Sequence, residues 1–233
     1  MWRAMLDPSL SRVATLEQTL AADERTRAGQ FHFQKDRTRF IVARGLLRAI
    51  LGRYLGRDPR ALRFCSNPYG KPSLAPESGG DAPLSFNVTH AGALALYAVT
   101  RNRAIGIDLE DIRVDVECDS IAEHFFSPLE RRMLRAVPPA MRPEAFFRCW
   151  TRKEAYIKAR GEGLSMPLDQ FDVSLAPGEP AVLLDARPDS SEHNRWSLQD
   201  LDAAAGFAAA LAMEGQAGRL RLWQWQGPGQ QSG

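Results

Sequence analysis

Residues 84–110 constrain the fold most, because three short apolar segments follow one another there with brief polar breaks. The segments cover residues 84–88, 94–100 and 104–109. Period-two alternation over such lengths predicts β-strands. Helical patterns flank this block on both sides, so the chain is expected to be an α+β protein in which two halves meet near residues 100–112.

The third of these strands carries two acidic residues. Ile105, Ile107 and Leu109 fall on one face, while Asp108 and Glu110 share the other face, because side chains alternate along a strand. Two carboxylates so close repel each other, and a hard divalent cation such as Mg²⁺ or Mn²⁺ relieves the repulsion. An isolated pair of this kind is, however, more often the solvent-facing edge of an amphipathic strand.

Three helices are predicted around the strands. Apolar residues at helical spacing predict one over 36–56. The capping box Ser127–Glu130 starts a second helix, which extends to about Ala136. A third runs over 143–160 and ends at Gly161. Residues 66–83 are rich in Ser, Asn, Pro and Gly and predict a loop. Short strand-like segments follow the last helix at 171–175, 181–184, 196–198, 207–212 and 220–225.

The last of these helices offers a third carboxylate. Trp150, Glu154 and Lys158 are four residues apart and form one stripe, with Lys153 beside it. An acid and a lysine at this spacing are commonly a surface ion pair. The tryptophan should draw the stripe inward, and a half-buried Glu154 then needs a cationic partner that it could share with Asp108 and Glu110.

Composition limits the remaining classes of protein. There is no run of eighteen apolar residues and no hydrophobic signal core at the N-terminus, so we expect a cytoplasmic protein that does not enter the membrane. Cys65, Cys118 and Cys149 are odd in number and widely spaced, which predicts small buried side chains and not a disulfide framework.

The first quarter of the chain is basic. Residues 1–63 contain thirteen Lys or Arg and six Asp or Glu, a balance that suits an anionic partner. A solvated arginine-rich helix face is an equally good explanation. A nucleic-acid-binding module is a further alternative, but it leaves the three carboxylates unexplained.

Four segments in a fixed order carry a family resemblance: YGKP (69–72), FNVTHAG (86–92), GIDLE (106–110) and WTRKEAYIK (150–158). The series resembles the 4′-phosphopantetheinyl transferases of the surfactin-synthetase-activating type. The resemblance covers about residues 20–175. It implies an α+β fold of two similar, pseudo-symmetric halves with the active site in the cleft between them. We expect an N-terminal half at 1–105, a C-terminal half at 106–226 and a disordered tail at 227–233.

The resemblance also implies roles for individual residues. Asp108, Glu110 and Glu154 would hold Mg²⁺, with Mn²⁺ as a possible substitute. The side chains implied in coenzyme A binding are Arg27, Lys71, Pro72, Thr89, His90, Lys153 and Lys158. Arg27 would hold the 3′-phosphate, and Lys71 and Pro72 would lie beside the adenine nucleotide. Thr89 and Ala91 depart from the family pattern: Thr89 keeps a hydroxyl, and Ala91 loses one.

The activity implied is transfer of the phosphopantetheine arm from coenzyme A to a serine of an acyl or peptidyl carrier protein, with release of adenosine 3′,5′-bisphosphate. Glu154 is the first choice as the base that accepts the serine proton, and Lys158 is the alternative. Fatty acid, polyketide and nonribosomal peptide synthases are all candidate pathways, and two fused halves would let a monomer act. The competing activity is an Mg²⁺-dependent hydrolase that acts on the diphosphate of coenzyme A-like substrates. The segment 112–134, with Phe125 and Phe126, is the candidate carrier surface, although both rings could equally belong to the core.

Overall fold

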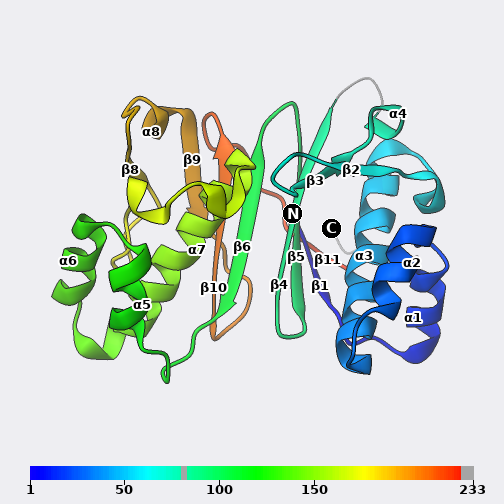
Figure 1. Ribbon diagram of the computed structural model, residues 1–233, viewed down its shortest axis with the longest axis horizontal. Coiled ribbons are helices and arrows are strands. Elements are labelled where there is room, and N and C mark those ends of the chain that lie inside the picture. Colours follow the sequence, from blue (N-terminus) through cyan, green and yellow to red (C-terminus); the bar gives the residue numbers. More distant parts are fainter. Residues whose placement is uncertain (80–82, 227–233) are drawn as a thin grey trace.

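The computed structural model describes residues 1–79 and 83–226, and the predicted disordered tail, 227–233, lies outside the described residues. Figure 1 shows two sheets in the middle of the molecule with helices on both outer sides. The first part of the chain contains β1 (Trp2–Met5), α1 (Leu10–Glu17), α2 (Ala22–Gly29), α3 (Gln34–Leu55), β2 (Phe64–Ser66), β3 (Pro72–Leu74), α4 (Pro76–Gly79), β4 (Leu84–Ala91) and β5 (Leu94–Arg101). The second part contains β6 (Ile105–Asp111), α5 (Cys118–Phe125), α6 (Pro128–Ala136), α7 (Arg142–Arg160), β7 (Phe171–Val173), β8 (Leu183–Ala186), α8 (Glu192–Arg195), β9 (Trp196–Asp200), β10 (Phe207–Glu214) and β11 (Trp223–Gln224).

The two parts share one topology. In the first, the strand order is β1-β5-β4, and in the second it is β6-β10-β9. In the first part β1 pairs antiparallel with β5, and β5 pairs antiparallel with β4. In the second part β6 pairs antiparallel with β10, and β10 pairs antiparallel with β9. In both parts the chain between the first strand and the last two strands contains a long helix (α3 or α7) and a short antiparallel pair (β2-β3 or β7-β8). The expected pair of similar α+β halves is therefore confirmed, although the sequence contains no obvious repeat.

Each sheet has one face toward helices and one toward the other sheet. On β5, Ala95 and Tyr97 pack toward α3, whereas Leu94, Leu96 and Ala98 belong to a core between the sheets. The same inter-sheet core receives apolar side chains from β6 and β10, which are Ile105, Ile107, Leu109, Ala209 and Leu211. The alternation predicted for 84–110 thus separates two cores, and the layers run helices, sheet, sheet, helices (Figure 1).

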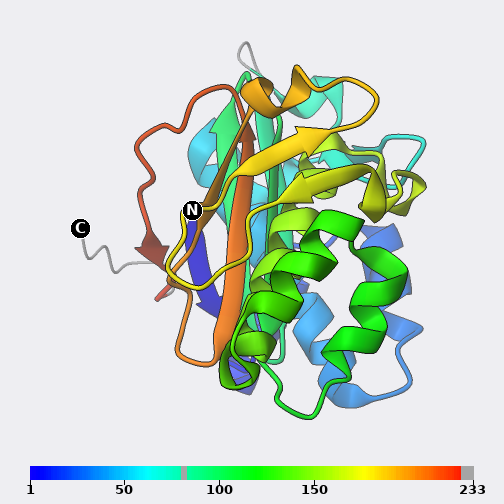
Figure 2. The same ribbon diagram turned by 90° about the vertical axis from the view of Figure 1, so that its left-hand side faces the viewer.

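The predicted helices and strands form close to the expected places. Gly161 ends α7 in a left-handed conformation with φ 78°, which glycine adopts without steric cost. The Ser127 hydroxyl accepts from the Glu130 amide, and the Glu130 carboxylate accepts from the Ser127 amide, so the predicted capping box is confirmed. Figure 2 shows α5 and α6 in front of α7, so the helical layer covers this face of the second sheet.

Three expectations need correction or extension. The predicted loop at 66–83 contains β3, α4 and the end of β2, because residues 64–66 and 72–74 pair across a short turn. Cys118 and Cys149 are buried as expected, but Cys65 is exposed on the β2-β3 pair. Strand β11, which the predicted division assigns to the C-terminal half, joins the first sheet beside β1. The predicted boundary after residue 105 falls just after the first residue of β6, a few residues beyond the end of β5, and the division itself stays a prediction.

Candidate active site

Gly106 lets helix α7 lie directly on strand β6. A Cβ atom at this position would stand 2.1 Å from the Ala155 carbonyl oxygen and 2.3 Å from the Ala159 amide nitrogen. Only glycine allows such an approach of backbone to backbone. Because side chains alternate along the strand, Asp108 and Glu110 point to this same side, toward α7. The glycine of GIDLE therefore brings two strand carboxylates against the helix that carries Glu154.

Asp108 lies at the centre of this contact and is only 3% exposed. Its Oδ1 atom accepts hydrogen bonds from Thr89 Oγ1 at 3.2 Å and Lys158 Nζ at 2.5 Å. Its Oδ2 atom is buried and has no hydrogen-bond partner among the described residues. A buried carboxylate oxygen without a partner is costly. This oxygen is therefore the atom of the site that most requires a further ligand.

Glu110 and Glu154 complete a group of three carboxylates. Desolvation, followed by the negative charge of Asp108, raises the pKa of Glu110 and of Glu154, whereas the Lys158 ammonium lowers both. Three acids thus face a single nearby ammonium, and their charges repel one another. Hard carboxylate oxygens are the ligands that Mg²⁺ prefers, so the donor set and the unpartnered Oδ2 fit such an ion. In the described part of the chain, no group of three or more His, Cys, Asp or Glu side chains lies in an arrangement that could hold a metal ion, so the magnesium assignment stays a prediction.

The predicted stripe on α7 is confirmed as the half-buried face of that helix. Trp150, Glu154 and Lys158 are all partly exposed, while most other residues of α7 between Thr151 and Ala159 are buried. Lys158 reaches Asp108 from this stripe. The stripe therefore presents an indole, a carboxylate and an ammonium along the edge of the site.

Lys153 does not belong to the site, and its expected role in coenzyme A binding is wrong. Its side chain is fully buried, and Nζ donates to both Glu130 carboxylate oxygens at 2.6 and 2.8 Å and to the Phe171 carbonyl oxygen at 2.7 Å. Residue 153 precedes Glu154 by one position, which turns its side chain by about 100° around the helix axis. That rotation directs it toward α6 and β7, away from Asp108.

Strand β4 supplies two neighbours of the carboxylates. Thr89, buried, holds Asp108 through its hydroxyl. His90 follows it and is exposed at the rim. Partial desolvation, followed by the positive charges of Lys158 and Arg39, lowers the pKa of His90, which favours the neutral imidazole near pH 7. Thr89 and His90 were both expected here, and the contact between Thr89 and Asp108 adds a role that the sequence did not predict.

The other expected coenzyme A residues lie farther from the carboxylates. Lys71 donates from Nζ to the carbonyl oxygens of Ile105 and Ala159, each at 3.0 Å. Pro72 begins β3 next to it. Arg27 is exposed on α2, where its guanidinium carbon stands 5.5 Å from the centre of the Phe40 ring. Among the described contacts none joins Arg27 to Asp108 or its neighbours, so its assignment to the 3′-phosphate stays a prediction.

Two residues near the site were not assigned a role from the sequence. Asn87, buried on β4, accepts from the Ile107 amide through Oδ1 at 2.8 Å, and so joins the edge strands of the two sheets. Arg39 adds positive charge near His90 and is held by Asp7 through two hydrogen bonds of 2.9 and 2.8 Å. Asn87 belongs to the FNVTHAG segment, and Arg39 belongs to the basic first quarter of the chain. Both therefore lie in segments whose sequence already indicated a functional role.

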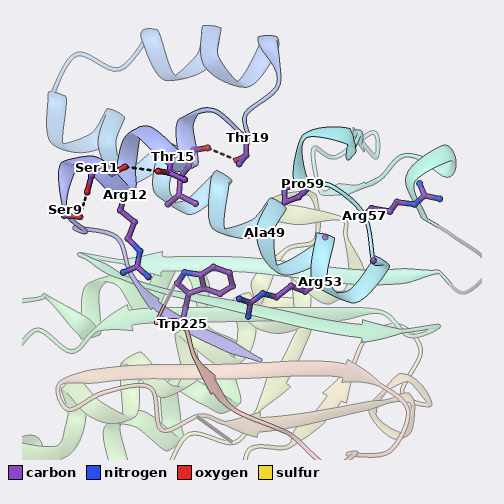
Figure 3. Close-up of a pocket in the computed structure, with 13 residues that line it drawn as sticks. Ser9, Ser11, Arg12, Thr15, Thr19, Ala49, Arg53, Arg57, Pro59 and Trp225 are labelled. Carbon is purple, nitrogen blue, oxygen red and sulfur yellow. Dashed lines mark hydrogen bonds between the residues drawn. The ribbon is translucent and has the colours of Figure 1, made fainter. Parts of the chain in front are cut away.

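One large cavity of the described structure lies away from the carboxylates. It has a volume of about 720 Å³ and lies between α1 and the C-terminal turn of α3. Figure 3 shows Arg12 and Arg53 beside the Trp225 indole at one end of this cavity. None of the expected catalytic, metal or coenzyme A residues lines it. Volume alone therefore does not locate the carboxylate site.

Comparison with known proteins places both halves in one family. Residues 104–212 match the profile of the 4′-phosphopantetheinyl transferase superfamily, and residues 4–102 match that of the 4′-phosphopantetheinyl transferase N-terminal region. The chain is 40% identical over 225 residues to the 4′-phosphopantetheinyl transferase HetI of Nostoc sp., a match that covers 97% of this chain and 91% of that protein. It is 30% identical to the 4′-phosphopantetheinyl transferase Sfp of Bacillus subtilis, with 82% and 81% of the two chains covered.

A solved structure gives a weaker likeness. The holo-[acyl-carrier-protein] synthase of Thermotoga maritima is 23% identical, with a TM-score of 0.40, and the match covers 49% of this chain and 64% of that one. The extent of the match to HetI, together with the two profiles that divide the chain between its similar halves, shows that this chain is an enzyme of the 4′-phosphopantetheinyl transferase superfamily.

Proposed function

We propose that this enzyme transfers the 4′-phosphopantetheine arm of coenzyme A to a serine of an acyl or peptidyl carrier protein in a magnesium-dependent reaction. Family membership supports the transfer. The observation that carries the metal dependence is Asp108, whose buried Oδ2 has no partner among the described residues while the charges of Glu110 and Glu154 lie nearby. These three side chains would hold Mg²⁺ together with the diphosphate.

The chemistry divides among the residues of this site. The serine Oγ attacks the β-phosphorus, a new P–O bond forms, and the bond to adenosine 3′,5′-bisphosphate breaks as that group takes the electron pair. Bound Mg²⁺ would supply positive charge that offsets the charge on the diphosphate oxygens. Lys158, held 2.5 Å from Asp108, offers an ammonium at the same place. His90 at the rim is a hydrogen-bond donor for the phosphates.

The serine proton needs an acceptor. Glu154 lies on the half-exposed stripe of α7, so its carboxylate is accessible to a substrate hydroxyl from the open side of the site. Lys158 is already engaged with Asp108 and would first have to leave that contact and lose a proton. Geometry therefore favours Glu154 as the base, with Lys158 holding the charge of the phosphate.

An exposed aromatic ring next to the stripe suits the carrier protein. Phe125 is 42% exposed. The Phe125 ring meets the Trp150 ring edge to face, with centroids 5.6 Å apart, and Trp150 is the first residue of the stripe that leads to Glu154. Phe126, in contrast, is buried in the core at 2% exposure. Of the two rings in the candidate carrier surface, Phe126 therefore belongs to the core, and Phe125 is the one that a partner can contact.

The decisive experiment is mass spectrometry of several apo carrier proteins after incubation with the enzyme, coenzyme A and Mg²⁺. The expected result is one phosphopantetheine adduct on the carrier serine, lost when EDTA removes the metal. Absence of the adduct on every carrier would overturn the proposal. Incubation without carrier tests the hydrolase alternative, which predicts rapid cleavage of coenzyme A and which no comparison supports. We further propose that the monomer is active, because one chain contains both halves.

A further inference from the structure

The connection between β2 and β3 reaches from the N-terminal half to the end of helix α7. Asn67 Nδ2 donates to the Gly161 carbonyl oxygen at 2.7 Å. Lys71 Nζ donates to the Ala159 carbonyl oxygen at 3.0 Å and to the Ile105 carbonyl oxygen at 3.0 Å. Ala159 lies in the last turn of α7, and Ile105 is the first residue of β6. One ammonium therefore bonds at once to the helix and to the strand that form the active site.

These carbonyl groups have no partner of their own in regular structure. The last carbonyls of a helix lack amide donors, and a cation near that end is also favoured by the helix dipole. Ile105 lies on β6, which is the outer strand of its sheet. Along that edge, Asn87 satisfies the Ile107 amide and Lys71 satisfies the Ile105 carbonyl. Side chains of the N-terminal half thus take the place of a missing neighbouring strand.

The turn that carries Lys71 is itself fixed. Asn67 Oδ1 accepts from the amides of Tyr69 at 3.0 Å and Lys71 at 2.9 Å, and the Asn67 amide donates to the Lys71 carbonyl oxygen at 3.0 Å. The Lys71 side chain also packs closely on Gly161, where an added Cβ would stand 3.2 Å from Lys71 Cδ. The backbone of Lys71 is fixed by its turn, its methylene groups pack on Gly161, and its ammonium is bound to two carbonyl oxygens. The side chain therefore has one position and is not free to move toward a ligand.

We propose that Lys71 is a positioning residue, whose ammonium fixes α7 against β6 and so holds Glu154 and Lys158 in register with Asp108. This inference rests on the proposed transfer reaction and departs from the expectation that Lys71 binds coenzyme A beside the adenine nucleotide. Ala159 adjoins Lys158, and Ile105 is three residues before Asp108, so a shift at either carbonyl is passed directly to the reacting groups. Burial also lowers the pKa of Lys71 to about 8, as expected for an ammonium away from solvent.

The test replaces Lys71 by methionine, which keeps the length of the side chain and removes its donors. We expect kcat to fall by about tenfold to a hundredfold, since small displacements of catalytic groups have effects of that size, while KM for coenzyme A changes by less than about twofold. A nucleotide-binding ammonium predicts the reverse, with KM raised and kcat kept, and that result would overturn the inference. Asn67→Ala, which keeps the ammonium but loosens its turn, should reproduce the loss of kcat in weaker form.

Arg101→Met is the matched control. Arg101 also donates to a backbone carbonyl, that of Tyr54 at 3.2 Å, but this bond stays within the N-terminal half. Amide hydrogen exchange supplies a readout that needs no carrier protein: exchange should accelerate in the last turn of α7 in Lys71→Met and not in Arg101→Met. Unchanged exchange there would refute the positioning role. Absence of transfer by the unaltered enzyme, with altered exchange in Lys71→Met, would instead refute the proposed reaction alone.

Discussion

Lys158 on α7 and Asp108 on β6 stand 2.5 Å apart, Nζ to Oδ1, although fifty residues separate them in the chain. The contact leaves Asp108 Oδ2 buried and unpartnered in the described structure. Asp108→Asn keeps the shape of the side chain and removes its charge. We expect transfer to fall by about a hundredfold to a thousandfold, the usual effect of losing one electrostatic group at a reacting centre. Rates of carrier modification measure the loss, circular dichroism checks that the fold is kept, and near-normal rates would contradict the assignment.

The buried pair of Lys153 and Glu130 should act on stability and not on substrate binding. Both side chains are 0% exposed, and removal of one partner leaves an uncompensated buried charge. Glu130→Gln or Lys153→Met should therefore lower the free energy of unfolding by about 3–5 kcal/mol. Arg135→Met is the control, because its side chain is 62% exposed and that of its partner Glu123 is 43% exposed, so its loss should cost far less. Urea unfolding of the three variants gives the comparison, and equal losses would show that burial does not distinguish the two ion pairs.

The close approach at Gly106 predicts a combined loss of stability and activity. Gly106→Ala places a methyl group 2.1 Å from the Ala155 carbonyl oxygen, so α7 must move away from β6. We expect a cost of at least about 1–3 kcal/mol, typical of overpacking, and slower transfer, since Glu154 and Lys158 move with the helix. Gly29→Ala is the control, because nothing lies within 4 Å of its added Cβ. Thermal unfolding and transfer rates that match for both variants would rule out the close contact.

Lys71 should make stability depend on pH above neutrality. Burial lowers its pKa from 10.5 to about 8. The folded protein therefore releases this proton at lower pH than the unfolded chain, so between about pH 8 and 10.5 the unfolded state binds more protons and the contribution of Lys71 to the free energy of unfolding rises with pH. That contribution is fully present above 10.5 and is lost as the pH falls through 8. Its neutral amine keeps two donors for the two carbonyls. Urea unfolding across this range should give a steeper rise for the unaltered enzyme than for Lys71→Met, and parallel curves would contradict the shift.

Phe125 provides a test of the carrier surface. Its ring is 42% exposed and rests on Trp150. Phe125→Asp replaces an exposed apolar ring by a charge that would lose its water in the interface, so KM for the carrier should rise by about tenfold or more while KM for coenzyme A is unchanged. Val182→Asp changes an apolar residue of similar exposure, 44%, in the segment just before β8 and serves as the control. Equal effects of the two substitutions would remove Phe125 from the carrier surface.

Much of this architecture could be predicted from local patterns. The alternation in residues 84–110 separated the inter-sheet core from the strand faces turned toward the helices, and the spacing of Trp150, Glu154 and Lys158 identified the half-buried face of α7. The position of Lys153 could not be judged in the same way. A lysine beside a site residue suggests phosphate binding, and only the packing of α6 and β7 on that side of the helix reveals its partner Glu130.

The roles of Asn87 and Lys71 were hidden for another reason. Asn87 accepts from the Ile107 amide, and Lys71 donates to the carbonyl oxygens of Ile105 and Ala159. Backbone donors and acceptors leave no mark in the identity of the residues that carry them. The difference in exposure between Phe125 and Phe126 could not be predicted from the sequence either. Both rings stand at the end of α5, and the chain leaves the helix so that one ring enters the core and the other stays exposed.

Strand β11 has a consequence for the way the chain acquires its structure. The Trp223 amide donates to the Met1 carbonyl oxygen at 2.9 Å, the Trp225 amide donates to the Arg3 carbonyl oxygen at 2.8 Å, and the Trp2 and Trp223 rings stack with centroids 5.8 Å apart. The outer edge of the first sheet is thus built from residues that the ribosome adds after the second half is complete. Domains of larger proteins usually fold as units, the earlier one first, during synthesis. Here the strand edge formed by residues 2–5 gains its neighbour only once residues 223–225 are made, so we expect the first sheet to be completed after the second.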